Sequence, residues 1–250
     1  MLQGHWHYRV LRYLCLLLSL LAVDRAAAVQ RVRFALPDFP PYVEGSGAAL
    51  SGIAVDWLRR LLTKSDVPYA LYAVPNYGRA LKELRVGRAD VFLVATRNAE
   101  RDRVATFLPT PFRAKWCWFV ASKRVAEFSG PDAFRRPGVT IGTVINTNTE
   151  YWLDHHHYRV GVTASSAAVL PRLLLNYDRL DAVLLTEDVF VKAATDDGIG
   201  PERYQCILNS EHSFGVYVSN RFIRNAPALF QRLRTALSTS AGRDAHPASP

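Results

Sequence analysis

Arg101 is the residue whose type and position suggest chemistry most directly. It ends the segment Thr96-Arg-Asn-Ala-Glu-Arg101, which follows the apolar run Val91–Ala95. Such a run is typical of a buried parallel strand, and ligands of open α/β sheets bind beyond the carboxyl ends of these strands. A guanidinium is a rigid fork of N–H donors that fits a carboxylate two-pronged. The sequence therefore offers a site for a small anionic molecule, although from the residues alone we favour Arg101 as a surface partner of Glu100 or Asp102.

The first 28 residues have the pattern of a secretory signal peptide. Arg9 and Arg12 precede the apolar run Leu14–Val23, and Ala26-Ala-Ala28 offers small residues for cleavage. The apolar run is shorter than the ~20 residues that a membrane-spanning helix needs. We therefore expect residues 1–28 to be removed and the mature protein to be exported to the periplasm.

The composition narrows the classes of function. Hydrophobic residues make up 49% of the 250 residues, which is enough for one large domain or two lobes. The net charge is +9, but no Lys/Arg run is interleaved with aromatic residues, so nucleic-acid binding is not predicted. Cys117 and Cys206 can form a disulfide in an oxidising compartment. We favour buried thiols because the two cysteines are far apart in the sequence.

No metal or cofactor is predicted. The segment His155-His-His157 contains adjacent histidines, which point in different directions and lack the i, i+4 spacing of a helical metal pair, so we expect a solvated turn. The sequence has no dinucleotide glycine fingerprint, phosphate loop or nucleophile elbow.

Hydrophobic periodicity predicts two halves with the same order of strand, helix, strand, helix, strand. The predicted elements of the first half are 31–36, 53–63, 69–74, 78–86 and 91–95, and those of the second half are 139–144, 149–155, 158–162, 167–175 and 182–185. A similar turn, Gly87-Arg-Ala-Asp90 and Asp178-Arg-Leu-Asp181, precedes the last strand of each half. This repetition favours two similar α/β lobes, each a mostly parallel sheet flanked by helices.

Two chain crossings are expected to join the lobes as a hinge. Pro109 and Pro111 exclude a helix before the predicted strand 116–121, so the first crossing is placed near 112–114. The return crossing is placed near 209–213. The remaining predicted elements are strands 204–208 and 214–219 and a final helix at 226–238. Lobe 1 is expected to comprise residues 29–113 and 211–238, and lobe 2 residues 114–210. The tail at 239–250 is expected to be disordered.

The order of short motifs resembles the extracellular solute-binding proteins of family 3, the type II periplasmic binding proteins of polar amino-acid ABC transporters. The resemblance covers nearly all of the chain after residue 28 and is firmest over 33–122. The motifs that carry it are Phe39-Pro-Pro-Tyr42, Gly52-Ile-Ala-Val-Asp56, Asn76-Tyr77-Gly78, Leu81-Lys-Glu-Leu84, Gly87-Arg-Ala-Asp90, Glu100-Arg101 followed by Phe107, and Pro111-Phe112.

The resemblance implies a ligand held between two closing lobes. Phe39 and Tyr77 fall where aromatic rings enclose the ligand, and the local composition around Tyr77 favours an exposed ring. Thr96 falls where a hydroxyl and a backbone N–H meet the ligand carboxylate, and Arg101 falls on the carboxylate-binding arginine. Aromatic rings exclude water from the site, and the guanidinium fixes one end of the solute.

The second half departs from the family pattern. Asn146-Thr147-Asn148 replaces a common Gly-Thr-Thr, so the amide of Asn148 becomes a candidate ligand contact. The acidic residue that grips an α-ammonium in the family falls near Thr186, and a hydroxyl cannot neutralise a buried ammonium. The neighbouring Glu187 or Asp188 can substitute for it only if the loop shifts. The predicted solute therefore bears a carboxylate but need not be an α-amino acid.

Several of these residues also have purely structural interpretations. Thr96 can cap the turn that follows it. We favour Thr186, together with Glu187, as a cap of the helix that begins near Asp188. Trp116 and Trp118 lie on one face of a predicted strand, and we expect them to pack in the core or at a lobe edge.

The resemblance implies a monomeric binding protein without catalytic residues, whose partner is an inner-membrane ABC permease. Two alternatives remain open. An enzyme of the dehydratase type on the same fold would need a general acid or base, for which Glu187, Asp188 and Asp38 are the candidates. A ligand sensor would use the same lobes without a permease.

Overall fold

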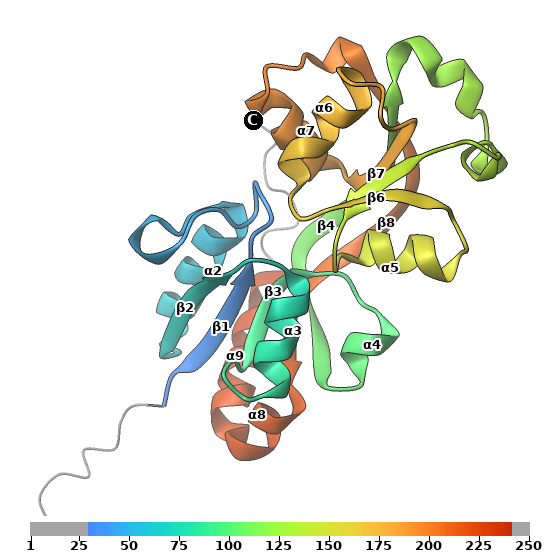
Figure 1. The fold of residues 1–250 in the computed structure, drawn as a ribbon. Coiled ribbons are helices and arrows are strands. Elements are labelled where there is room, and N and C mark those ends of the chain that lie inside the picture. The colour runs from blue at the N-terminus through green and yellow to red at the C-terminus, as the bar shows by residue number, and fades with distance from the viewer. Residues whose placement is uncertain (1–29, 242–250) are drawn as a thin grey trace, which may run out of the picture. The chain divides into compact units, whose positions relative to one another are not determined.

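The strands of the computed structural model, which describes residues 30–241, form one mixed sheet (Figure 1). Its order is β2-β1-β3-β8-β4-β7-β5-β6. β1 is parallel to β2 and β3, and β5 is parallel to β6 and β7, whereas β8 is antiparallel to β3 and β4. The strands are β1 Val32–Pro37, β2 Tyr69–Val74, β3 Val91–Ala95, β4 Ala105–Ala121, β5 Ile141–Val144, β6 Val160–Ala164, β7 Ala182–Thr186 and β8 Tyr204–Ser219.

Helices flank the strands in the predicted alternation. They are α2 Ile53–Lys64, α3 Tyr77–Arg85, α4 Ala99–Asp102, α5 Asn148–His155, α6 Leu170–Leu175, α7 Glu187–Asp196, α8 Asn220–Asn225 and α9 Pro227–Ala241. The predicted helix 167–175 is divided into a 3-10 turn and α6, because Pro171 lies in the first turn of α6 and cannot continue a preceding helix. No helix within residues 30–241 is long and apolar enough to cross a bilayer.

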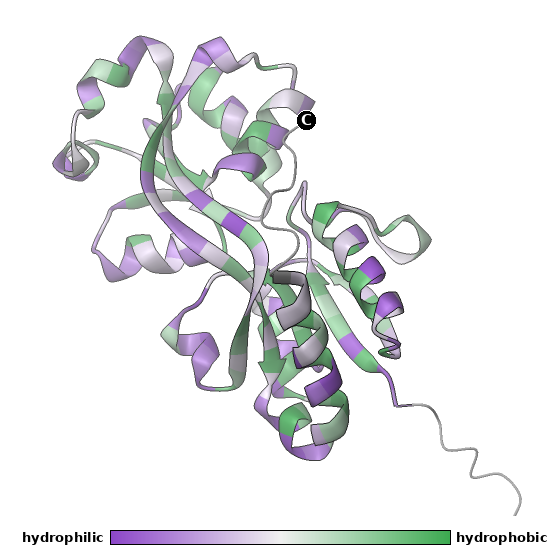
Figure 2. Cartoon of the chain, turned by 180° about the vertical axis from the view of Figure 1, so that it is seen from behind, coloured by the Kyte–Doolittle hydropathy of each residue, from purple (hydrophilic) through white to green (hydrophobic). Residues whose placement is uncertain are grey.

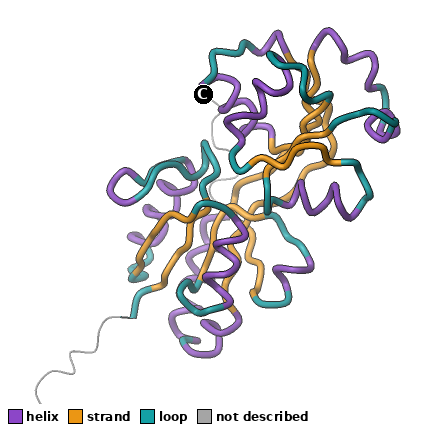
Figure 3. The backbone as a smooth tube through the Cα atoms, viewed as in Figure 1, coloured by secondary structure: helices purple, strands orange, loops and turns teal. Residues whose placement is uncertain are grey.

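Two long strands connect the two groups of parallel strands (Figure 3). β8 pairs with β3 near its carboxyl end, and the end of β4 pairs with β7, while β4 and β8 pair with each other along most of their length. The predicted crossings at 112–114 and 209–213 therefore lie inside continuous strands, and the predicted break in the strand 204–219 is wrong. The crossing segments can contain polar residues and remain strands because they are partly exposed to solvent. Figure 2 shows hydrophilic bands along these long strands.

Prolines explain why the beginning of β4 was not predicted as a strand. Pro109 pairs with Gly215, and the register of the β4–β8 ladder then shifts between Pro109 and Arg113. Pro111, which has no N–H to donate, stands within this irregularity. A side chain at Gly215 would collide with the Leu108 carbonyl and the Phe107 ring, so this crossing requires a glycine.

The two groups of strands define the two lobes of the fold. Lobe 1 contains β1, β2 and β3, and lobe 2 contains β5, β6 and β7. Phe92 of lobe 1 is fully buried and stacks on Tyr217, and Phe119 of β4 stacks on Phe190 of α7 in lobe 2 with ring centres 3.9 Å apart. Aromatic packing thus anchors both ends of the crossing strands.

The aspartate that ends the repeated turn motif makes the same kind of hydrogen bonds in each lobe. Asp90 accepts hydrogen bonds from the backbone N–H of Arg33, at 3.0 Å, and from its guanidinium. Asp181 accepts from the backbone N–H of Thr140, at 2.8 Å, and from the guanidinium of Arg124. Each aspartate joins the entrance of one strand to a neighbouring segment, which confirms that these are strand-entrance residues.

Cys117 and Cys206 form a disulfide, so the prediction of buried thiols is wrong. Their Cα atoms are 5.3 Å apart on the adjacent strands β4 and β8, although 89 positions separate them in the sequence. Cα atoms at this spacing are within reach of an S–S bond. Pairing therefore depends on which strands become neighbours and not on the sequence distance.

The ends of the chain are only partly described. The predicted signal peptide, residues 1–28, lies outside the described residues. Helix α9 continues through Thr239 to Ala241, so these three positions do not belong to a disordered tail. The rest of that predicted tail, 242–250, also lies outside the described residues.

Candidate ligand site

Helix α4 places Arg101 just beyond the carboxyl end of β3. Asn98 caps this helix because its side chain accepts a hydrogen bond from the backbone N–H of Arg101 at 2.8 Å. The hydroxyl of Tyr217 accepts from Asn98 N–H and donates to Asp102, both at 3.0 Å. Burial raises the pKa of Tyr217 to about 12, so this hydroxyl remains a donor at neutral pH. Asn98, not Thr96, is therefore the cap of this turn.

Arg101 is buried, with 4% of its surface exposed. Its guanidinium donates to the carbonyls of Thr96 (3.0 Å) and Asn146 (3.2 Å) and lies 5.0 Å from the centre of the Tyr77 ring. Burial lowers the pKa of Arg101, because water no longer stabilises the charge. Among residues 30–241, no carboxylate lies within 4.0 Å of this guanidinium. A buried cation held only by carbonyls and by the rings of Tyr77 and Phe92 has unused capacity for an anion.

Arg101 lines a cavity of about 20 Å³ that both lobes enclose. Six of the seven predicted ligand contacts line it: Phe39, Tyr77, Thr96, Arg101, Asn148 and Thr186. Five further residues line it: Val94, Trp116, Thr147, Thr149 and Phe214. The aromatic members come from separate parts of the chain, so a search for adjacent aromatic residues would not have found Trp116 and Phe214 together.

The aromatic wall is buried in this structure. The exposed fractions of Phe39 and Tyr77 are both 5%, so the prediction that Tyr77 is exposed is wrong. Tyr77 begins α3, packs edge-on against Phe39, and donates its hydroxyl to the carbonyl of Val94. Burial raises the pKa of Tyr77, which keeps the ring neutral.

A local irregularity of β3 directs its end toward the cavity. The register with β8 shifts between Phe92 and Ala95, and Val94 has a φ of 60°, which is rare for a β-branched residue. Bulges of this kind turn side chains and occur near functional sites. The residue types of this strand contain no signal of the bulge.

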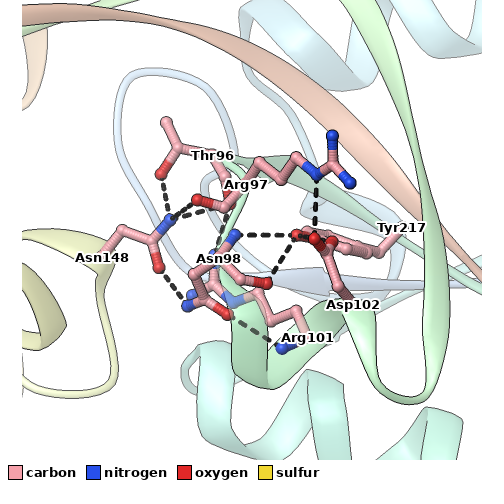
Figure 4. A network of polar contacts seen from close by, with 7 residues as sticks. All are labelled: Thr96, Arg97, Asn98, Arg101, Asp102, Asn148 and Tyr217. Carbon is pink, nitrogen blue, oxygen red and sulfur yellow. Dashed lines mark hydrogen bonds and ion pairs between the residues drawn. The ribbon is translucent and has the colours of Figure 1, made fainter.

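Asn148 connects the two lobes (Figure 4). It is the first residue of α5, and its amide nitrogen donates to the carbonyls of Thr96, at 2.8 Å, and Arg97, at 3.2 Å, and to the Thr96 hydroxyl. Its amide oxygen accepts from the side chain of Asn98. An asparagine from lobe 2 therefore occupies polar groups of lobe 1 next to Arg101.

Contacts on other sides of the cavity also join the lobes. Tyr42 donates its hydroxyl to Asp188, and Lys192 lies 4.0 Å from Glu44. A side chain at Gly78 would meet the amide group of Asn146, so α3 approaches lobe 2 closely. The structure therefore represents an arrangement in which the lobes are in contact.

Replacing Asn148 with alanine should favour separation of the lobes. The loss of inter-lobe amide bonds is expected to destabilise the contacting arrangement by roughly 1–3 kcal/mol. Small-angle scattering of the ligand-free protein should show a larger radius of gyration. Asn76→Ala is the matched control, because Asn76 caps α3 through Arg79 within lobe 1. Identical scattering from Asn148→Ala and Asn76→Ala would contradict this role.

Thr186 and Glu187 lie at the end of β7 but face different surroundings. Thr186 occupies the N-cap position of α7 without a side-chain cap bond, so the predicted capping role is wrong; its side chain is buried and lines the cavity. Glu187 does not line the cavity and pairs with Lys115 at 3.7 Å. Of the predicted contacts, Glu187 alone is not brought to Arg101.

Within residues 30–241, possible metal ligands are not gathered into a usable group. The only cluster of three among the described residues contains Cys117, Glu187 and Cys206, and both of its sulfur atoms belong to the disulfide. His155 stacks on Tyr151 within α5, and His156, which follows the end of α5, stacks on Trp152.

Comparisons with known proteins identify the fold. No family model and no curated protein matches the sequence. The ligand-binding core of GluR0 from Nostoc punctiforme, in complex with L-glutamate, has a TM-score of 0.70 and 18% identity over 86% of this chain and 94% of that chain. The substrate-binding protein AbpA of an amino acid ABC transporter from Streptococcus pneumoniae, bound to L-arginine, has a TM-score of 0.68 and 15% identity over 86% and 90%.

A third neighbour is a binding protein that is the precursor of an enzyme. AncCDT-1, an ancestral amino acid-binding protein and a precursor of cyclohexadienyl dehydratase, has a TM-score of 0.69 and 14% identity over 86% of this chain and 91% of that chain. These likenesses confirm the predicted fold, the two-lobed type II fold of periplasmic binding proteins. At such identities they establish the fold alone.

Proposed function

We propose that this protein captures a small carboxylate-bearing solute, an amino acid or a related organic acid, between its two lobes. The predicted contacts are Phe39, Tyr77, Thr96, Arg101, Asn148 and Thr186, with Glu187 at the periphery. The protein acts as a monomer and delivers the solute to an ABC permease for import. AbpA, a substrate-binding protein of an ABC transporter, supports the transport role by likeness of fold.

One observation carries this proposal, namely the burial of Arg101 at an inter-lobe cavity without a carboxylate partner within the described chain. Retaining a desolvated guanidinium is costly unless an anion compensates it for part of the functional cycle. A carboxylate ligand would supply two charge-assisted hydrogen bonds to it.

Binding requires the lobes to separate and close again. A cavity of about 20 Å³ has little more than the space for one water molecule, so a solute cannot enter the present arrangement. The crossing of β4 and β8, with register shifts at Pro109/Arg113 and Trp116/Cys117, is the proposed hinge. The ligand would shift an existing balance between open and closed forms.

The proposed location is the periplasm. The pattern of residues 1–28 is that of a signal peptide, and the Cys117–Cys206 disulfide fits an oxidising compartment.

A dehydratase-like enzyme is the second candidate, because AncCDT-1 is a precursor of one. Such an enzyme needs a general acid or base at the ligand. Glu187 is bound to Lys115 outside the cavity, and Asp38 is exposed. Turnover of a bound solute that disappears in Glu187→Gln would favour the enzyme, whereas release of the solute unchanged would favour the receptor.

A thermal-shift and calorimetry screen of small carboxylates tests the proposed function. A ligand at 100 times its Kd should stabilise the folded protein by about 2.7 kcal/mol. Acidic or neutral carboxylates should give the largest shifts, with one molecule bound per chain. Lysine and arginine serve as matched basic carboxylates, and a largest shift from either of them would contradict the preference for acidic or neutral carboxylates.

A further inference from the structure

We propose that the solute lacks an α-ammonium group and is a small hydroxy- or oxo-carboxylate. This inference rests on the proposed function, since it names the ligand class of the same cavity. It follows from the charges that the described residues bring to the cavity wall, from the helix ends that meet there, and from the hydroxyl groups that replace an acid.

Arg101 is the only ionised side chain among the residues that line this cavity. The nearest acids at the end of β7 have other partners: Glu187 pairs with Lys115, and Asp188 accepts from Tyr42. On the opposite side, Asp102 accepts from Tyr217 and pairs with Arg97. The wall of the cavity thus carries one positive charge and no carboxylate.

Two helices present their amino-terminal ends to the same cavity. Thr147, Asn148 and Thr149 line it from the start of α5, and Thr186 lines it at the start of α7. A helix amino terminus carries a partial positive charge that favours anions. The carboxylate of Glu150 in the first turn of α5 accepts from the backbone N–H of Asn146 and does not line the cavity. The amino-terminal ends of the two helices and Arg101 therefore all favour a negative charge in the cavity.

A ligand with an α-ammonium is poorly matched to these surroundings. Its cation would lie beside a guanidinium and two helix amino termini, and a buried ammonium without a carboxylate partner is strongly disfavoured. A hydroxyl or carbonyl oxygen at the same carbon can exchange hydrogen bonds with the Thr186 hydroxyl or the Asn148 amide. A monocarboxylate of this kind also balances the single positive charge of the cavity wall.

Asp38 is the acid that competes with this inference. It lines an adjoining cavity of about 10 Å³, together with Phe39 and Tyr77, which line both cavities. Asp38 itself does not line the Arg101 cavity, and its side chain is exposed. Partial desolvation of its carboxyl and, to a smaller extent, the charge of Glu44 raise the pKa of Asp38.

Calorimetry with matched ligand triplets tests the inference. Each triplet differs only at the α-carbon: glutamate, 2-hydroxyglutarate and 2-oxoglutarate; alanine, lactate and pyruvate; phenylalanine, phenyllactate and phenylpyruvate. In the triplets that bind, the hydroxy or oxo member should bind at least about tenfold more tightly than the amino acid. Tighter binding of the amino acid would overturn this inference and leave the proposed function intact. Failure of every carboxylate to bind would overturn both.

Thr186→Asp tests whether a carboxylate added at the cavity allows the protein to bind an α-ammonium group. It adds a carboxylate at the cavity and should reverse the preference toward the amino acid, whereas Thr186→Asn, which adds no charge, should not reverse it. Asp38→Asn should leave the preference of the wild-type protein unchanged. An amino-acid preference in the wild type that Asp38→Asn abolishes would assign the ammonium to Asp38 and overturn the inference. The comparison of ligands on the wild-type protein stands even if Thr186→Asp does not fold.

Discussion

Arg101→Ala should weaken binding of the carboxylate solute at least about tenfold, because it removes charge-assisted hydrogen bonds worth ~1.5–3 kcal/mol. The guanidinium is buried at the inter-lobe cavity and donates only to the carbonyls of Thr96 and Asn146, so its remaining donors are available to a ligand. Calorimetry with the best carboxylate from the screen measures the effect. Unchanged affinity would remove Arg101 from the site.

Stability of the ligand-free protein separates a binding role from a structural one. If Arg101 only holds the lobe together, its removal should lower the melting temperature with and without ligand. If it serves the ligand, the variant should lose the ligand-induced shift while its ligand-free stability falls little or rises, since a desolvated charge has been removed. Arg85→Ala is the matched control, because Arg85 is an exposed arginine that pairs with Glu100.

Arg101→Lys refines this test. It keeps the positive charge but replaces the planar fork with a single ammonium. An affinity between those of the wild type and Arg101→Ala would indicate a two-pronged contact with the carboxylate. Full wild-type affinity in Arg101→Lys would indicate that charge alone is recognised.

Loss of the Cys117–Cys206 disulfide should lower the free energy of unfolding by about 2–4 kcal/mol. The bond closes a long loop, since the cysteines are 89 positions apart. The entropy of closing a loop grows with its length. For a chain of this size the melting temperature should fall by roughly 5–15 °C. Cys117→Ala with Cys206→Ser is the suitable double variant, because Cys117 is fully buried and Cys206 is exposed.

Dithiothreitol is the control for the disulfide. It should destabilise the wild-type protein to the level of the double variant and leave the double variant itself unaffected. Equal stability of the wild-type protein with and without the reductant would contradict a disulfide that stabilises the fold. Denaturant titrations of both proteins provide the measurement.

The sequence by itself determined the alternation of strands and helices and the place of Arg101. Periodicity is a local property, so strands β1, β2, β3 and β7 were predicted within about one residue of their observed bounds. The position of Arg101 depends only on one strand and the turn after it, which lie within eleven residues, Val91 to Arg101.

Tertiary structure decided everything that depends on which distant segments become neighbours. Trp116 and Phe214 reach the cavity because β4 and β8 pair along the crossing, and the same pairing brings Cys117 to Cys206. Thr186, the last residue of β7, lines the cavity, whereas Glu187, the first residue of α7, pairs with Lys115 outside it, because the chain changes from strand to helix between them. Contacts between segments far apart in the chain leave no local pattern from which they can be predicted.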